Sequence, residues 1–254
     1  MDHCHEHEAD MFPPLSDPYE PAFRQQLDVD VAAPTNEQFD WYGRRARRLE
    51  ECLSALDAAK SAGTVVEIGS GPIGIVNFLD WGTRYAVDRL EHVYRTQPNL
   101  VNLRNPAVTY LDGTGERLPF ESASCSLVIL DNVIDRIDAP GKILEEIHRI
   151  LRPGGHLYLC VSVHTRWGLV LHSLAAAHQT DTGHPCVFTS PSLRRFLHTN
   201  RFDLLLERIE DYEACKRADR DSPNLKARLR GYAGLSAFPH AVICAKADAY
   251  PYTS

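Results

Sequence analysis

The chain has 254 residues, of which 44% are hydrophobic and 24% are charged, a balance typical of a soluble globular protein. Its 27 basic and 34 acidic side chains give a formal charge of −7, whereas a nucleic-acid-binding protein normally carries a basic face. No window approaches the roughly 18 uninterrupted apolar residues that a membrane-spanning helix needs. The composition therefore disfavours nucleic-acid and membrane partners.

The cysteines indicate a reducing compartment. There are seven, widely spread and without a CxxC pair, so we expect no disulfide framework. They are Cys4, Cys52, Cys125, Cys160, Cys186, Cys215 and Cys244. The first seven residues are polar and acidic, unlike a signal peptide, and a cytoplasmic protein is expected.

Residues 1–34 are rich in Pro, Asp and Glu and predict a flexible arm before a single domain over 35–254. The arm contains the cluster His3-Cys4-His5-Glu6-His7, whose residue types bind transition metals. The cluster lacks a second half with matched spacing, so no metal site is predicted.

From residue 36 onward, hydrophobic periodicity predicts alternating helices and strands. Strands are expected at Thr64–Ile68, Arg84–Val87, Ala107–Leu111, Ser126–Leu130 and His156–Val163. Helices are expected at Asn36 to about Ala59, Ile73–Leu79, Leu90–Thr96 and Gly141–Leu151. Strands separated by helices imply an α/β fold with a mostly parallel sheet, which binds its ligand beyond the carboxyl ends of the strands.

The C-terminal third predicts additions to this sheet. Helices over 166–178 and Ser190–His198 are expected to form a cap at about 166–200. Two closing strands are expected at Leu204–Ile209 and Pro239–Ala245, separated by a charged insertion at about 211–235.

The first predicted helix carries the densest basic run, Arg44-Arg45-Ala46-Arg47-Arg48, interleaved with apolar residues. We interpret this run as the solvated face of an amphipathic helix. Trp41 and Tyr42 on the same helix either close over a ligand or simply pack in the core.

A glycine-rich turn follows the first predicted strand, in Glu67-Ile68-Gly69-Ser70-Gly71. Glycines let the backbone turn sharply and approach a ligand closely. The acidic Glu67 would repel a pyrophosphate but could accept a hydrogen bond from an ammonium group or a ribose hydroxyl. The turn therefore favours a nucleoside that carries an amino acid, with S-adenosylmethionine as the candidate.

Polar residues also end the next three strands. Asp88 ends the second strand, 21 residues after Glu67, where it can accept from both ribose hydroxyls. Asp112 ends the third and can accept from an adenine amino group, and Asp131-Asn132 ends the fourth. Any one of these could be a helix cap, but four in register are harder to explain in that way.

An ordered series of segments resembles the class I S-adenosylmethionine-dependent methyltransferases, in the small-molecule subgroup. Besides the glycine turn, the segments are Val87-Asp88, Gly115-Glu116-Arg117-Leu118-Pro119-Phe120, Ser126–Val133 and Glu146–Gly155. The resemblance is strong over roughly residues 60–165. It implies a Rossmann-like seven-stranded sheet with helices on both faces and the last strand antiparallel.

The resemblance also implies a pocket for S-adenosyl-L-methionine. The predicted cofactor residues are Glu67, Gly69, Ser70, Gly71, Asp88, Arg89, Asp112, Gly113, Thr114, Asp131 and Asn132. One departure is that Ile73 replaces the third glycine of the usual G-x-G-x-G and Gly74 follows it, which gives the G-x-G-x-x-G spacing of dinucleotide-binding proteins. A second departure is that relatives often carry a histidine where this chain has Asp135-Arg136.

Methyl transfer to a hydroxyl or an ammonium group requires a general base. The candidates are Asp135, His164 and His184, with His172 as a further one, all after the fourth and fifth strands or in the cap. The alternative role for each histidine is purely structural, as a residue that stabilises the fold by hydrogen bonding.

The sequence favours a methyltransferase that acts on an O or N atom of a small-molecule acceptor. An NAD-dependent oxidoreductase is an alternative that leaves Glu67 and Asp112 unexplained, and a non-catalytic cofactor-binding module is another. The identity of the acceptor and the oligomeric state stay open, a homodimer included.

Overall fold

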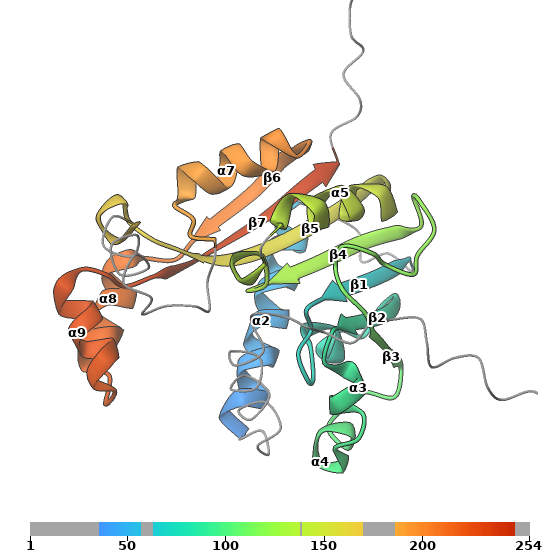
Figure 1. The fold of residues 1–254 in the computed structure, drawn as a ribbon, viewed down its shortest axis with the longest axis horizontal. Coiled ribbons are helices and arrows are strands. Elements are labelled where there is room, and N and C mark those ends of the chain that lie inside the picture. The colour runs from blue at the N-terminus through green and yellow to red at the C-terminus, as the bar shows by residue number, and fades with distance from the viewer. Residues whose placement is uncertain (1–35, 57–62, 138, 170–185, 247–254) are drawn as a thin grey trace, which may run out of the picture.

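The computed structural model describes residues 36–56, 63–137, 139–169 and 186–246. Within them, seven strands form one sheet in the order β3-β2-β1-β4-β5-β7-β6 (Figure 1). The strands are β1 Thr64–Ile68, β2 Thr83–Asp88, β3 Val108–Asp112, β4 Cys125–Asp131, β5 Leu151–Val163, β6 Phe202–Ile209 and β7 Phe238–Lys246. Only β7 is antiparallel, to both β5 and β6, which confirms the predicted sheet and its antiparallel last strand.

The strand order reverses at the centre of the sheet, between β1 and β4. The chain runs outward from β1 through β2 to β3, then crosses back to place β4 on the other side of β1. Ligands of parallel α/β sheets bind at such a switch point, outside the carboxyl ends of the strands. The register pairs Ile68 with both Val87 and Leu130, so the residues that follow these three strands reach the same edge.

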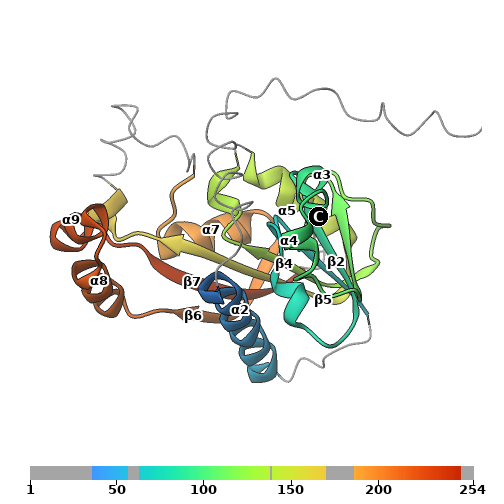
Figure 2. The same ribbon diagram turned by 90° about the horizontal axis from the view of Figure 1, so that it is seen from below.

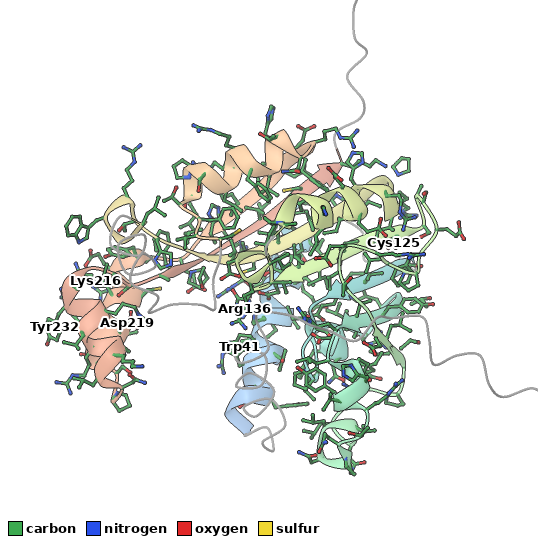
Figure 3. The ribbon with its side chains drawn as sticks, in the orientation of Figure 1. Trp41, Cys125, Arg136, Lys216, Asp219 and Tyr232 are labelled. Carbon is green, nitrogen blue, oxygen red and sulfur yellow. The ribbon has the colours of Figure 1, made fainter. Side chains whose placement is uncertain are left out.

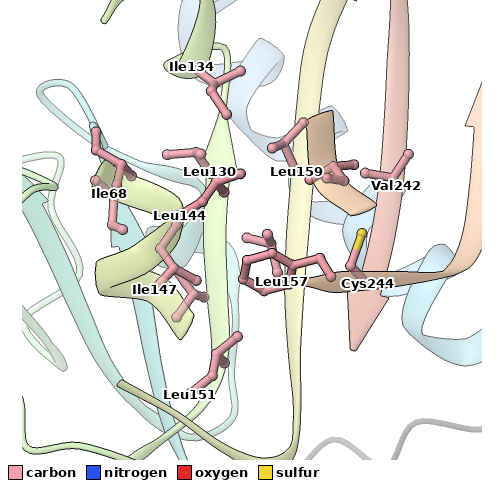
Figure 4. Packing of buried hydrophobic residues seen from close by; sticks show 14 of the residues in the cluster. Ile68, Leu130, Ile134, Leu144, Ile147, Leu151, Leu157, Leu159, Val242 and Cys244 are labelled. Atoms are coloured by element: carbon pink, nitrogen blue, oxygen red, sulfur yellow. The ribbon is translucent and has the colours of Figure 1, made fainter. Parts of the chain in front are cut away.

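Helices cover both faces of the sheet, as Figure 1 and the turned view in Figure 2 show. One face packs against α5 (Pro140–Ile150) and α7 (Ser190–Thr199), and the other against α2 (Asn36–Ala55) and the 3₁₀ turn η1 (Ile75–Phe78). In α5 the apolar residues Ile143, Leu144, Ile147 and Ile150 recur on one side of the helix and are all buried. Figure 4 shows two of them packed on the leucines of β4 and β5.

The segment after the glycine turn differs from the sequence-based expectation. Instead of the predicted helix at Ile73–Leu79 there is only η1, a single 3₁₀ turn. Gly74, which precedes it, has a φ of 81°, outside the helical region. Because β2 begins at Thr83, few residues remain for a longer helix.

Other predicted elements also differ in their bounds. The predicted helix at Leu90–Thr96 is reduced to α3 (Glu91–Tyr94), followed by a second short helix, α4 (Pro98–Val101). Helix α2 ends at Ala55, and residues 57–62 lie outside the described part of the chain. Strand β5 starts at Leu151, which pairs with Cys125 of β4. The chain then bulges through Pro153-Gly154-Gly155, where Gly154 has a φ of 70°, and the pairing resumes between His156 and Leu127.

The insertion between β6 and β7 is a helical hairpin of α8 (Tyr212–Asp221) and α9 (Leu225–Ala233). Asp211 and Asn224 cap the two helices with their side chains. Figure 3 shows Lys216, Asp219 and Tyr232 on this hairpin. Because β6 is parallel to β5, the hairpin leaves the sheet at the carboxyl edge. Of the predicted cap helix over 166–178, residues 166–169 are helical and the remainder lies outside the described residues.

Candidate functional site

The glycine turn after β1 is held tightly against the ends of β2 and β4. Gly69 and Gly71 have φ values of 67° and 62°, which glycine adopts without steric cost. The backbone N–H of Gly69 donates to the carbonyl of Val87 at 2.8 Å. A Cβ on Gly69 would lie 2.5 Å from Cγ2 of Val133, so only glycine fits there. The buried Ser70 donates its hydroxyl to the carbonyl of Gly71.

Glu67 is buried beneath this turn. Its Oε2 atom accepts from the backbone N–H of Val76 at 2.9 Å, in the first turn of η1. Burial raises the pKa of the Glu67 carboxyl to about 7. A Cβ on Gly74 would lie 2.8 Å from the same oxygen, so the displaced third glycine makes room for the carboxylate. Glu67 therefore organises the turn from within, in addition to any contact with a ligand.

Asp88, at the end of β2, joins the glycine turn to the next segment. Its Oδ2 atom accepts from the backbone N–H of Gly71 at 2.8 Å, and its Oδ1 atom accepts from that of Leu90 at 2.9 Å. The Asp88 carboxylate therefore lies between the glycine turn and the segment that follows β2. Arg89 follows directly and is half-buried.

Asp112 ends β3 beside Asp88, with which it pairs in register. The backbone N–H of Gly113 donates to the carbonyl of Asp88 at 3.3 Å. The imidazole of His92 lies 3.4 Å from Oδ2 of Asp112, a contact that the sequence did not predict. Thr114 begins the following loop and is exposed. The end of β3 thus presents an accessible carboxylate.

Asp131 and Asn132, at the end of β4, are held by Arg45 of α2. The guanidinium of Arg45 forms an ion pair with Asp131, with Nε 2.6 Å from Oδ2. The side chains are 9% and 3% exposed, and burial lowers the pKa of Arg45. Asn132 has a φ of 54°. When its amide oxygen faces Arg45, this oxygen accepts a hydrogen bond from Nη2 of Arg45 at 2.9 Å. Interpreting the whole Arg44–Arg48 run as solvated was therefore wrong at Arg45.

The beginning of α2 lies over the glycine turn. The Tyr42 hydroxyl would be 2.9 Å from a Cβ on Gly71, and Trp41 stacks on the guanidinium of Arg45 at 4.1 Å. Trp41 is 41% exposed and labelled in Figure 3 near the start of α2. Of the two alternatives for these aromatic residues, the contacts favour closure over the sheet edge.

Two candidate bases lie beyond β4 and β5. Asp135 is buried in the 3₁₀ turn η2 (Ile134–Arg136), and its carbonyl accepts from the N–H of Cys186 at 3.2 Å. His164 directly follows β5, and its N–H donates to the carbonyl of Phe188 at 2.8 Å. The segment 186–188 therefore ties the two candidates to the same region. His172 and His184 lie outside the described residues.

Within the residues that the structure describes, no group of three or more His, Cys, Asp and Glu side chains has a metal-binding arrangement, and the His-Cys cluster at 3–7 lies outside them. None of the helices in that part of the chain is long and apolar enough to cross a membrane.

The sequence profile of a family described as a methyltransferase domain matches residues 66–159. That stretch runs from β1 into β5 and contains the glycine turn and all four strand-end carboxylates, Glu67, Asp88, Asp112 and Asp131. Residues 66–159 form a methyltransferase domain. With the seven-stranded sheet around it, the domain has the class I fold.

Comparison with individual proteins agrees with this assignment. An uncharacterised methyltransferase from Mycobacteroides abscessus is 29% identical over 107 residues, which make up 41% of this chain and only 40% of that protein. Geranyl diphosphate C-methyltransferase from Streptomyces coelicolor A3(2) has a TM-score of 0.61 at 14% identity, covering 92% of this chain and 100% of its own. The 1,6-didemethyltoxoflavin-N1-methyltransferase from Burkholderia thailandensis has a TM-score of 0.56 at 19% identity, covering 96% and 99%. At these identities the two solved structures establish the fold alone.

Proposed function

We propose that the chain is an S-adenosylmethionine-dependent methyltransferase that methylates an O or N atom of a small-molecule acceptor. The observation that carries the proposal is the acidic edge of the methyltransferase domain. Carboxylates end four adjacent strands around one glycine turn, at Glu67, Asp88, Asp112 and Asp131. This edge suits a ligand with hydroxyls, an amino group and positive charge.

Asp88 is the proposed ribose ligand, because its carboxylate, a hydrogen-bond acceptor, lies directly beside the glycine turn at the end of β2. Asp112 and the Gly113 backbone are the proposed adenine contacts, with Arg89 and Thr114 alongside. Glu67, Asp131 and Asn132 are proposed to line the end that receives the methionine moiety. Ser70, Gly69 and Gly71 provide the close backbone approach.

The same geometry argues against a dinucleotide. A pyrophosphate at a glycine turn needs free backbone N–H donors. Here the N–H of Gly71 already donates to the Asp88 carboxylate at 2.8 Å, and the buried Glu67 lies beneath the turn. A pyrophosphate would lose a donor and meet negative charge.

When bound, S-adenosylmethionine supplies an already activated methyl group, so the protein contributes mainly position and proton transfer. His164 and Asp135 are the proposed bases from the described residues, and His184 stays a candidate from the cap. The cap at 166–200 and the α8–α9 hairpin are proposed to enclose the acceptor.

Equilibrium dialysis tests this function before any acceptor is known. We expect S-adenosylmethionine and S-adenosylhomocysteine to compete for one saturable site and NAD to leave that site free. Saturable NAD binding with no competition between the other two ligands would replace the proposal by the dinucleotide alternative.

A further inference from the structure

A groove of about 730 Å³ lies between α2 and the end of β6 with the start of β7. Figure 2 shows α2 beside these two strands. None of the residues that line the groove belongs to the proposed cofactor set. The lining is split between charged side chains of α2 and β6 and a small apolar floor of Ile209, Pro239 and Ala241. Its volume is within the range of small-molecule sites.

Each carboxylate in the groove already has its own cation. Arg48 forms an ion pair with Glu210. Arg208 pairs with Glu51 at 2.9 Å. Glu207, the third carboxylate, accepts from Arg194 of α7 at 2.7 Å. The acidic side chains therefore do not neutralise any further arginine in the groove.

Arg44 and Arg47 are the two cations left over. Both are exposed and line the groove, and neither forms an ion pair within the described residues. They are three residues apart on α2, so their side chains are neighbours on one side of the helix. Two like charges at this spacing destabilise a helix slightly, and an anion between them removes that repulsion.

We propose that this groove is a second ligand site, which binds a phosphate or pyrophosphate group of a small molecule. Arg44 and Arg47 are the anion ligands, because two guanidinium forks match the oxygens of a phosphoryl group. The apolar floor receives the organic part of the ligand. Arg48, in the next position of the helix, is fixed by Glu210 and adds positive potential to the same wall.

Calorimetric titration with inorganic pyrophosphate at low ionic strength tests the site in the full chain. We expect saturable binding that weakens at least about tenfold in the double variant R44A/R47A, since charge-assisted hydrogen bonds are lost. The matched control is R95A/K142A, which removes the same charge from exposed positions outside the groove and should leave the affinity unchanged. The charge-preserving R44K/R47K variant should also bind weakly, because lysine lacks the bidentate fork.

Three results would overturn the proposal: no saturable binding, an equal loss in both alanine variants, or full affinity in R44K/R47K. The last two would indicate a diffuse effect of net charge. The affinity of the same variants for S-adenosylhomocysteine should stay unchanged. Loss of pyrophosphate binding tests the groove, whereas loss of S-adenosylhomocysteine binding tests the proposed methyltransferase function, so the two failures are distinguishable.

Discussion

Glu67 and Gly74 fit each other in space: a Cβ at position 74 would lie 2.8 Å from Oε2 of Glu67 and 3.1 Å from Cβ of Ser70. Gly74 also has a φ of 81°, which an L side chain adopts only with strain. The buried carboxylate thus explains why the third glycine stands one position later than in the usual turn.

Gly74→Ala is expected to destabilise the protein by about 3 kcal/mol, because backbone strain adds to the clash with Glu67. Gly154→Ala is the matched control. Gly154 has a φ of 70° but no atom within 4 Å of a Cβ, so its loss should cost only about 1 kcal/mol. Urea unfolding of both variants measures the difference. Equal losses of stability in the two variants would mean that Gly74 is required only for its positive φ.

The raised pKa of Glu67 predicts a pH-dependent loss of stability. Its folded-state pKa of about 7 lies above the ordinary value of 4.5, so folding favours the protonated carboxyl. The resulting stability is complete below the unfolded-state pKa and is lost as the pH rises through about 7. Between about pH 5 and pH 8 the wild type should lose about 3 kcal/mol relative to Glu67→Gln, which does not titrate. Parallel stability profiles of the two proteins would contradict the burial of a titrating carboxyl.

The ion pair between Arg45 and Asp131 predicts a large stability effect. Arg45→Ala leaves Asp131 buried without its partner, which should cost about 3 kcal/mol. Arg208→Ala removes an exposed arginine whose side chain is 45% accessible and whose partner Glu51 is 62% accessible, so it should cost less than about 1 kcal/mol. Chemical denaturation compares the two. Similar losses would show that Arg45 does not neutralise a buried charge.

His164 is the proposed base that can be tested most selectively. His164→Asn should lower kcat by about 100-fold while the affinity for S-adenosylhomocysteine changes by less than about twofold. His198→Asn, at an exposed position of α7, is the control and should change neither value. If kcat and the affinity for S-adenosylhomocysteine both fall in His164→Asn, the histidine supports the site structurally instead of transferring a proton.

Local sequence patterns were sufficient to predict the sheet, but they did not predict the contacts at its carboxyl edge. The run Ser126–Leu130 is apolar because β4 is buried on both faces, and this pattern identifies it as a strand without further information. The helix expected after the glycine turn is only a 3₁₀ turn, because Gly74 leaves the helical region just before it and β2 already begins at Thr83.

Arg45 shows the same limitation at longer range. Its partner Asp131 is 86 residues away, so the basic run alone gave no sign that one of its four arginines is buried. Its neighbours Arg44 and Arg47 are exposed, as expected for an amphipathic helix. The position of α2 on the sheet, which the helical pattern does not specify, determines which arginine meets a carboxylate.

Calorimetric titration of S-adenosylhomocysteine into the wild type, Asp88→Asn and Asp203→Asn tests the central claim most directly. Asp88→Asn keeps an acceptor oxygen for the turn but loses the charge proposed to bind ribose, and Asp203 is an exposed carboxylate of β6. We expect one saturable site in the wild type and in Asp203→Asn, and at least about tenfold weaker binding in Asp88→Asn. No binding by the wild type, or equal affinity in all three proteins, would contradict it.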